Sequence, residues 1–150
     1  MNKPKLLISV IPICSTTDTI FIGKRVEDLK LNVVSGKLKY SEEFDEAASR
    51  LLVEELGLNI TSKERFNFIC TYNIVDKDIG IHFVGVMYYV LLDKEETEKI
   101  VINKFTFSSF VFATIDDILN FKEEFFLSFS IFLSKYSIKN INDIKLLVSS

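Results

Sequence analysis

The segment of residues 36–58 constrains the fold of this chain more than any other, because a loop there leads into a helix rich in carboxylates. On a helical wheel at about 100° per residue, the apolar side chains form one broad arc and the charged side chains mostly occupy the other. Glu55 is the exception, since it falls inside the apolar arc between Ala48 and Leu51. A carboxylate there is costly unless a cation, a metal ion or several hydrogen-bond donors compensate it. Glu55 is therefore the first candidate for a functional residue.

The length and composition of the chain favour one folded domain over residues 1–150. The sequence is 48% hydrophobic with 14 Phe, which excludes general disorder and predicts a Phe-filled core. The formal net charge of −3 has no basic excess, so no nucleic-acid partner is expected. No apolar run approaches the roughly 18 residues of a membrane span. We therefore expect a cytoplasmic protein without a membrane partner, whose Cys14 and Cys70 are buried free thiols.

Hydrophobic patterning predicts a series of strands separated by polar turns. Pro12 interrupts the first strand and indicates an edge strand or a bulge, because proline has no backbone N–H to donate. The longest apolar run is typical of a central strand and forms a hairpin with the strand before it. The charged stretch 93–99 is expected to be a loop. The predicted strands cover residues 6–14, 19–24, 31–34, 66–75, 81–92 and 105–113.

Three helices are predicted between and after these strands. The first covers residues 42–56, with Ser41 as its N-cap and Gly57 as its stop. Thr114 caps a short helix over residues 115–120. A C-terminal helix over residues 123–136 carries Phe at helical spacing, which indicates core packing or an oligomer surface. Alternating strands and helices of this kind predict an α/β (α+β) fold with a central mixed sheet.

The segment 36–58 resembles the Nudix box of the MutT-like Nudix hydrolase superfamily. That pattern is Gly, five residues, Glu, seven residues, then Arg-Glu-aliphatic-x-Glu-Glu-x-Gly-aliphatic. The resemblance implies a Nudix-type α/β/α sandwich that hydrolyses a nucleoside diphosphate linked to another moiety, with Mg²⁺ or Mn²⁺ as the cofactor. Eight of the nine fixed positions match: Gly36, Glu42, Arg50, Leu52, Glu54, Glu55, Gly57 and Leu58.

The resemblance also implies a role for each matching residue. Glu54 and Glu55 correspond to the paired metal ligands, Glu42 to a supporting acidic position, and Arg50 to the residue that braces these carboxylates. The backbone carbonyl of Ser35 or Gly36 would be a further metal ligand. Oxygen ligands suit hard divalent cations, which neutralise diphosphate oxygens and orient a water for attack.

Residues outside the carboxylate set are weaker candidates. Arg25 and Lys37 are candidates for binding substrate phosphates, although Lys24 and Arg25 at a strand end are equally well explained as solvated cations. His82 is more typical of a satisfied core or cleft-wall residue than of a catalytic base.

Leu51 departs from the family pattern, because it stands where the family has the first Glu of its Arg-Glu pair. Leucine can neither ligate a metal nor take a proton from water, and only an acidic residue elsewhere, for example within 93–98, would replace it. The less favoured alternative is that Glu54 is a solvated partner of Arg50 and that Glu55 is a carboxylate satisfied by Arg25 or a backbone donor.

Two functions follow for this degenerate box. The favoured one is a divergent hydrolase that cleaves a nucleotide diphosphate linkage by metal-assisted attack of water. The alternative is a catalytically impaired Nudix-fold module that binds a ligand or a protein. The nature of the nucleotide and a homodimeric state stay open at this stage.

Overall fold

The chain is described by a computed structural model that covers residues 3–149. Within this range seven strands form one mixed sheet, in which the path β3-β2-β1-β6-β5 is extended by β4 on β1 and by β7 on β2. β1 and β6 run parallel, whereas the other strand pairs are antiparallel. The strands are β1 (Lys5–Cys14), β2 (Thr19–Arg25), β3 (Leu31–Asn32), β4 (Val34–Lys37), β5 (Phe66–Asp76), β6 (Ile81–Leu92) and β7 (Phe107–Ala113).

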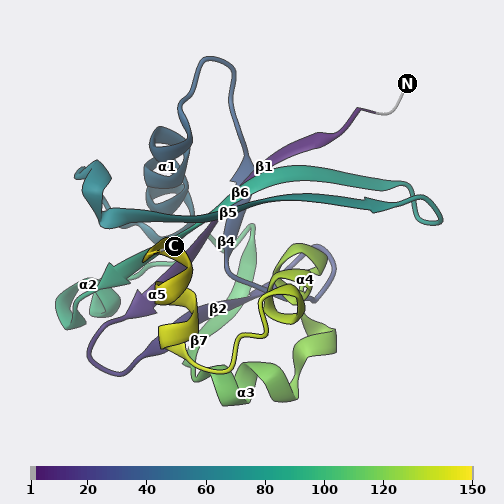
Figure 1. Ribbon diagram of the computed structural model, residues 1–150. Coiled ribbons are helices and arrows are strands. Elements are labelled where there is room, and N and C mark those ends of the chain that lie inside the picture. Colours follow the sequence, from purple (N-terminus) through teal and green to yellow (C-terminus); the bar gives the residue numbers. More distant parts are fainter. Residues whose placement is uncertain (1–2, 150) are drawn as a thin grey trace.

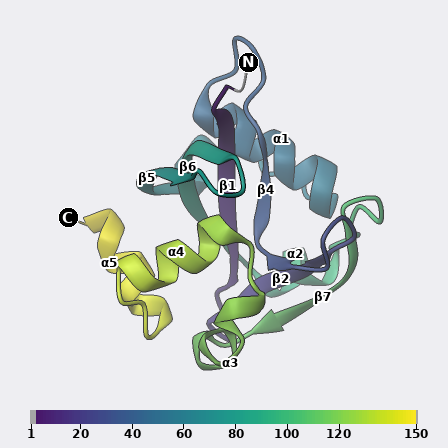
Figure 2. The same cartoon turned by 90° about the vertical axis from the view of Figure 1, so that its right-hand side faces the viewer.

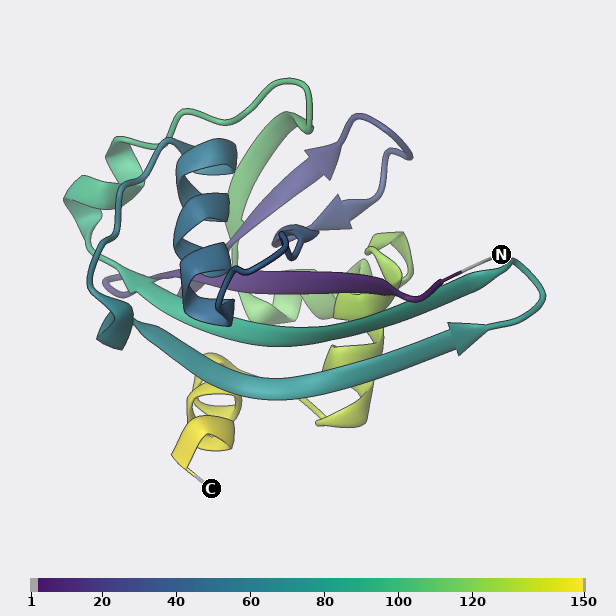
Figure 3. The same cartoon turned by 90° about the horizontal axis from the view of Figure 1, so that it is seen from above.

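Helices cover both faces of this sheet (Figures 1 and 3). α1 (Phe44–Leu56) lies on one face, and α4 (Leu127–Lys135) and α5 (Ile141–Ser149) lie on the other, as the rotated view also shows (Figure 2). The predicted α/β/α sandwich around a mixed sheet is thereby confirmed. Among the described residues no helix is long and apolar enough to cross a membrane.

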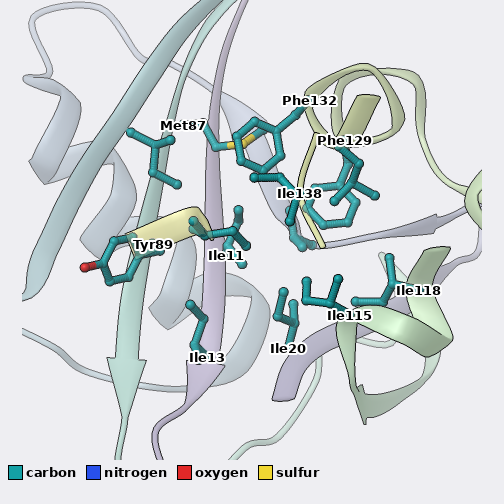
Figure 4. Close-up of a cluster of buried hydrophobic side chains, with 14 of the residues drawn as sticks. Ile11, Ile13, Ile20, Met87, Tyr89, Ile115, Ile118, Phe129, Phe132 and Ile138 are labelled. Carbon is teal, nitrogen blue, oxygen red and sulfur yellow. The ribbon is translucent and has the colours of Figure 1, made fainter. Parts of the chain in front are cut away.

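Each face of the sheet has its own hydrophobic core, because side chains of a strand alternate between the two faces. On the α1 face, Val10 and Phe21 pack with Leu52. On the other face, Phe129 and Phe132 of α4 belong to one buried cluster with Ile11 and Met87 (Figure 4). Aromatic side chains therefore fill the core, as the composition predicts.

β1 changes partners along one of its sides. Residues Leu7 to Val10 pair with β4, and Ile13 and Cys14 pair with β2, while β6 accompanies β1 along its whole length. β1 is thus an interior strand, and the prediction of an edge strand or bulge at Pro12 is wrong, since Pro12 stays in register with Val90 of β6.

The absence of an N–H group on Pro12 is tolerated because its nitrogen points toward the place where β1 changes its neighbouring strand. Leu38 N–H donates to Leu6 O on the β4 side, and Ser15 N–H donates to Leu92 O on the β6 side. Because backbone groups alternate along a strand, even-numbered residues of β1 turn their hydrogen-bonding groups away from β6. The nitrogen of Pro12 therefore points into the gap between the end of the β4 ladder and the start of the β2 ladder.

α1 begins later than predicted and with a different cap. Its N-cap is Glu43, which forms a reciprocal capping box with Glu46, so the prediction of Ser41 is wrong. Ser41 has a φ of 64° and belongs to the preceding loop. The predicted stop is confirmed, since Gly57 has a φ of 67°, a left-handed conformation that glycine adopts without strain.

Three other segments differ from the prediction. The expected strand 31–34 is divided between β3 and β4, and the expected loop 93–99 contains α2 (Lys94–Glu98), whose N-cap Asp93 forms a capping box. The expected helix 123–136 is a 3-10 turn (Lys122–Glu124) followed by α4, and α5 was not predicted. The short helix α3 (Ile115–Asn120), capped by Thr114, is confirmed, and so are the two buried free cysteines.

Candidate functional site

Arg50 of α1 ties the helix to the loop before it and to β4. Its guanidinium donates to both carboxylate oxygens of Glu42, from Nε to Oε2 at 2.7 Å and from Nη2 to Oε1 at 3.0 Å. It also donates to Glu54 Oε2 at 3.1 Å and to the backbone carbonyl of Lys37 at 2.8 Å. The planar fork of arginine suits such multiple acceptors. Arg50 therefore fixes the position of β4 relative to α1.

The Glu42–Arg50 pair shifts the titration of both partners. Hydrogen bonds from Arg50 are the main reason that the pKa of Glu42 lies below its ordinary value, and burial opposes them. The pKa of Arg50 is raised mainly by the same hydrogen bonds. Glu42 is thus kept ionised, and its carboxylate holds the Arg50 side chain in place.

Glu54 lies at the surface between two cations. It pairs with Arg50 and with Lys39, whose Nζ is 3.6 Å from Glu54 Oε1, and 43% of its side chain is exposed. Ion pairs at this exposure are weak. Glu54 is therefore a solvated partner of Arg50 in this structure, and its side chain is free to turn toward a stronger ligand.

Glu55 is buried and only half satisfied, with 8% of the residue exposed. Asn103 Nδ2 lies 3.4 Å from Glu55 Oε1, a long contact, and Glu55 Oε2 has no hydrogen-bond partner among residues 3–149. Arg25 does not reach it, because Arg25 pairs with Glu27 and Asp28, so that expectation is wrong. Asn103 follows no recognisable sequence pattern and was missed. The unpaired oxygen is a natural contact point for a cation.

The direction of the β4 ladder distinguishes the carbonyls of Ser35 and Gly36. Gly36 is the register partner of Ile8, and Leu38 N–H donates to β1, so the even-numbered residues of β4 face β1. The carbonyl of Lys37 instead accepts from Arg50. By the same alternation, the carbonyl of Ser35 points away from β1 and is available to a ligand.

Leu51 does not belong to a polar site. It is 3% exposed and packs in the apolar core beneath α1. Within the described part of the chain, no three His, Cys, Asp or Glu side chains come together to hold a metal ion. Within residues 93–98, Glu96 pairs with Arg65 at 2.7 Å and Asp93 caps α2, so neither of these two carboxylates replaces the acidic residue missing at Leu51. A metal ion would therefore have to be held by Glu55 together with neighbouring oxygen atoms that turn toward it.

A polar cleft of about 560 Å³ lies on the sheet face opposite α1, beside the first residues of the box. Ser35, Gly36 and Lys37 line it from β4, and Phe126 lines it from the loop before α4. Glu42, Glu54 and Glu55 are not among its lining residues. The cleft and the carboxylates are therefore connected only through β4, which the hydrogen bond from Arg50 to the carbonyl of Lys37 links to α1.

The cations of the cleft are not equivalent. Arg25 stacks on Phe126, with its Cζ 4.4 Å from the ring centroid, and donates to Glu27 and Asp28, so its charge is already neutralised. The three lysines of the cleft form no ion pair within the described residues. They are Lys3, Lys5 and Lys37.

Two of these lysines, Lys5 and Lys37, lie on neighbouring strands. Lys37 is the register partner of Leu7, two residues after Lys5, so these two lysines project from neighbouring strands on the same face of the sheet. His82 lines the cleft as well and its Nε2 lies 2.8 Å from Asn73 Oδ1, as expected for a cleft-wall residue. This part of the cleft is suited to an anion.

The whole arrangement is that of the Nudix fold, and many solved structures share it. A scan against family models finds no match to the sequence, and neither does a search of curated proteins. The likeness lies in structure, at 15–19% sequence identity.

Three of these structures illustrate the likeness. A NUDIX hydrolase from Nitrosomonas europaea matches with a TM-score of 0.68 and 15% identity, over 89% of this chain and 87% of that chain. The NUDIX domain of Shewanella oneidensis NrtR, complexed with ADP ribose, matches with a TM-score of 0.64 and 15% identity over 80% and 79%. A bifunctional NMN adenylyltransferase/ADP ribose pyrophosphatase from Francisella tularensis, complexed with AMP and a Mn ion, matches with a TM-score of 0.68 and 16% identity over 90% and 42%.

Proposed function

We propose that this protein binds a nucleotide-type diphosphate, a nucleoside diphosphate linked to another moiety, in the cleft beside β4. The observation that carries this proposal is that three lysines without an ion pair among the described residues, Lys3, Lys5 and Lys37, line a polar cleft. Unpaired cations within a concave surface attract and hold phosphates. The ADP ribose and AMP bound by two proteins of the same fold support this class of ligand.

Arg25 has a smaller part in this proposal than Lys37. Two carboxylates already occupy its guanidinium, so it forms the wall of the cleft and contacts a ligand only through its remaining N–H groups. Lys37 combines a free ammonium group with a backbone carbonyl that Arg50 holds in place. It is the better positioned of the two cations for phosphate binding.

Hydrolysis of the bound diphosphate is the second candidate function, and the unpaired oxygen of Glu55 favours it. In this case Glu55, Glu54 and the carbonyl of Ser35 would hold Mg²⁺ or Mn²⁺, with Arg50 and Glu42 as braces. Such an ion supplies charge neutralisation at the diphosphate and an activated water. Leu51 argues against rapid turnover, because an apolar side chain lies where an acidic one is required.

Binding and turnover can be measured on the same protein. Titration calorimetry with ADP-ribose, ADP and inorganic pyrophosphate tests binding in chelator and in Mg²⁺. Release of phosphate or pyrophosphate from nucleoside triphosphates, dinucleoside polyphosphates and nucleotide sugars tests hydrolysis with Mg²⁺ or Mn²⁺.

The outcomes separate the two functions. Binding without turnover supports the first proposal, and metal-dependent turnover that Glu55→Gln abolishes supports the second. Absence of binding to every probe would refute the first, whereas turnover unchanged in Glu55→Gln would refute the role of Glu55. Leu51→Glu is the companion variant, since a large gain in rate would show that only this position limits catalysis.

A further inference from the structure

A chain of hydroxyl groups leads from the interior of the protein to the floor of the cleft. Ser35 Oγ lies 3.4 Å from Ser9 Oγ, and Ser9 Oγ lies 3.1 Å from the hydroxyl of Tyr72. Ser128 of α4 lies near the same Tyr72 hydroxyl and lowers its pKa slightly, against the larger effect of burial. Ser9 and Ser128 are 1% and 3% exposed, so water does not compete for these groups. Among the described residues, this series of hydroxyl groups reaches a candidate ligand site only at the cleft.

The sheet is shaped to let Tyr72 reach Ser9. Tyr72 of β5 is the register partner of Gly85 of β6, which in turn pairs with Leu7 of β1. A Cβ on Gly85 would lie 2.4 Å from Tyr72 Cζ and 2.6 Å from Leu7 O. The tyrosine ring therefore crosses β6 over a glycine, and any larger residue would displace it.

Within this series, the Ser35 hydroxyl can form a further hydrogen bond. Its contact with Ser9, at 3.4 Å, is longer than the 3.1 Å contact between Ser9 and Tyr72. When Tyr72 donates to Ser9 and Ser9 donates to Ser35, the proton of Ser35 is directed into the cleft. Hydrogen bonds in such a series polarise one another. Burial raises the pKa of Tyr72, which keeps its donor proton in place.

We infer that the Ser35 hydroxyl donates a hydrogen bond to a phosphate oxygen of the ligand, and that Tyr72, acting through Ser9, is a positioning residue for this contact. This inference rests on the proposed function, since it needs an anionic ligand beside Lys37. It adds a side-chain donor to a position that the sequence marked only for its backbone carbonyl.

Calorimetric titration with inorganic pyrophosphate and with ADP tests the inference in chelator. Tyr72→Phe removes one hydroxyl and is expected to weaken binding about 3–10-fold, and Ser35→Ala about 10-fold. The double variant is expected to bind no more weakly than Ser35→Ala alone, because Tyr72 acts only through Ser35. Ser35→Thr, which keeps a hydroxyl, is expected to retain most of the affinity.

Tyr88→Phe is the matched control, since Tyr88 is a buried tyrosine in the core beneath α1. Removal of its hydroxyl is expected to leave the affinity for both probes unchanged. Unchanged affinity in Tyr72→Phe, or losses that multiply in the double variant, would overturn the inference and leave the proposed function standing. Failure of the unmodified protein to bind either probe would overturn both.

Discussion

Leu51 of α1 lies directly against Gly36 of β4, so closely that a Cβ on Gly36 would come within 2.4 Å of Leu51 Cδ2. The glycine lets the helix approach the strand, and the leucine fills the space between them. Because Ser35 precedes this glycine, the apolar contact lies next to a carbonyl that is free for a ligand. The residue that most weakens the case for catalysis is thus also part of the helix–strand packing.

Leu51→Glu is expected to destabilise the metal-free protein by about 3–5 kcal/mol, because it places a carboxylate in an apolar contact. Thermal unfolding in chelator measures this loss. If the new carboxylate joins Glu55 in holding a cation, millimolar Mn²⁺ recovers part of the lost stability. Leu51→Met is the control and is expected to cost less than about 1.5 kcal/mol with no response to Mn²⁺. Full stability of Leu51→Glu in chelator would contradict the packing argument.

Glu55→Gln is expected to stabilise the metal-free protein by about 1 kcal/mol, since a neutral amide replaces a buried carboxylate with one unpaired oxygen. Chemical denaturation in chelator provides the measurement. Glu54→Gln is the matched control on the same helix, where exposure makes the change nearly neutral. A loss of stability in Glu55→Gln would show that Glu55 is satisfied as it stands.

The stability of the protein is expected to decline at acid pH through Glu42. Its pKa is lowered on folding by hydrogen bonds from Arg50, so its contribution is complete above the ordinary carboxyl value of 4.5 and is lost as the pH falls through the lower, folded value. Glu42→Gln is expected to cost about 2 kcal/mol at neutral pH, because it weakens hydrogen bonds to a charged group, and to flatten the stability profile below pH 4.5. Glu98→Gln, at an exposed site on α2, is the control. An identical acid profile in Glu42→Gln would refute this assignment.

Lys37→Met is expected to weaken pyrophosphate binding about 10-fold at low salt and to make the affinity less sensitive to ionic strength. Calorimetry at two salt concentrations measures both effects. Lys94→Met on α2 is the comparison, because that lysine is exposed and outside the cleft lining. Equal losses in the two variants would indicate a general charge effect rather than a binding site.

The sequence predicted the sheet and α1 because their signals are local. The apolar run over β6 predicts a buried strand, and the glycine after α1 predicts the end of a helix, each from residues within the same short segment. Ser41 misled the prediction of the N-cap, since Glu43 and Glu46 cap the helix reciprocally and leave Ser41 in the loop. α5 was missed because its packing against β5 depends on the folded sheet.

The candidate site was predictable only where it lies in one segment. The contacts of Arg50 with Glu42 and Glu54 follow from spacing along the box. Asn103, Ser9 and Tyr72 could not be found in this way, because they approach the site from distant strands and loops. Cytoplasmic location and a homodimer stay predictions.

Pro12 marks the residue at which β1 exchanges β4 for β2 as its neighbour. The ladder between β1 and β4 ends before it and the ladder with β2 begins after it, at an atom that has no hydrogen to donate. Before this point β4 lies beside β1 in place of β2, and Ser35 and Lys37 of β4 line the cleft together with Arg25 from the far end of β2. Because proline has no N–H, the exchange of partner strands leaves no backbone donor of β1 unpaired at this residue.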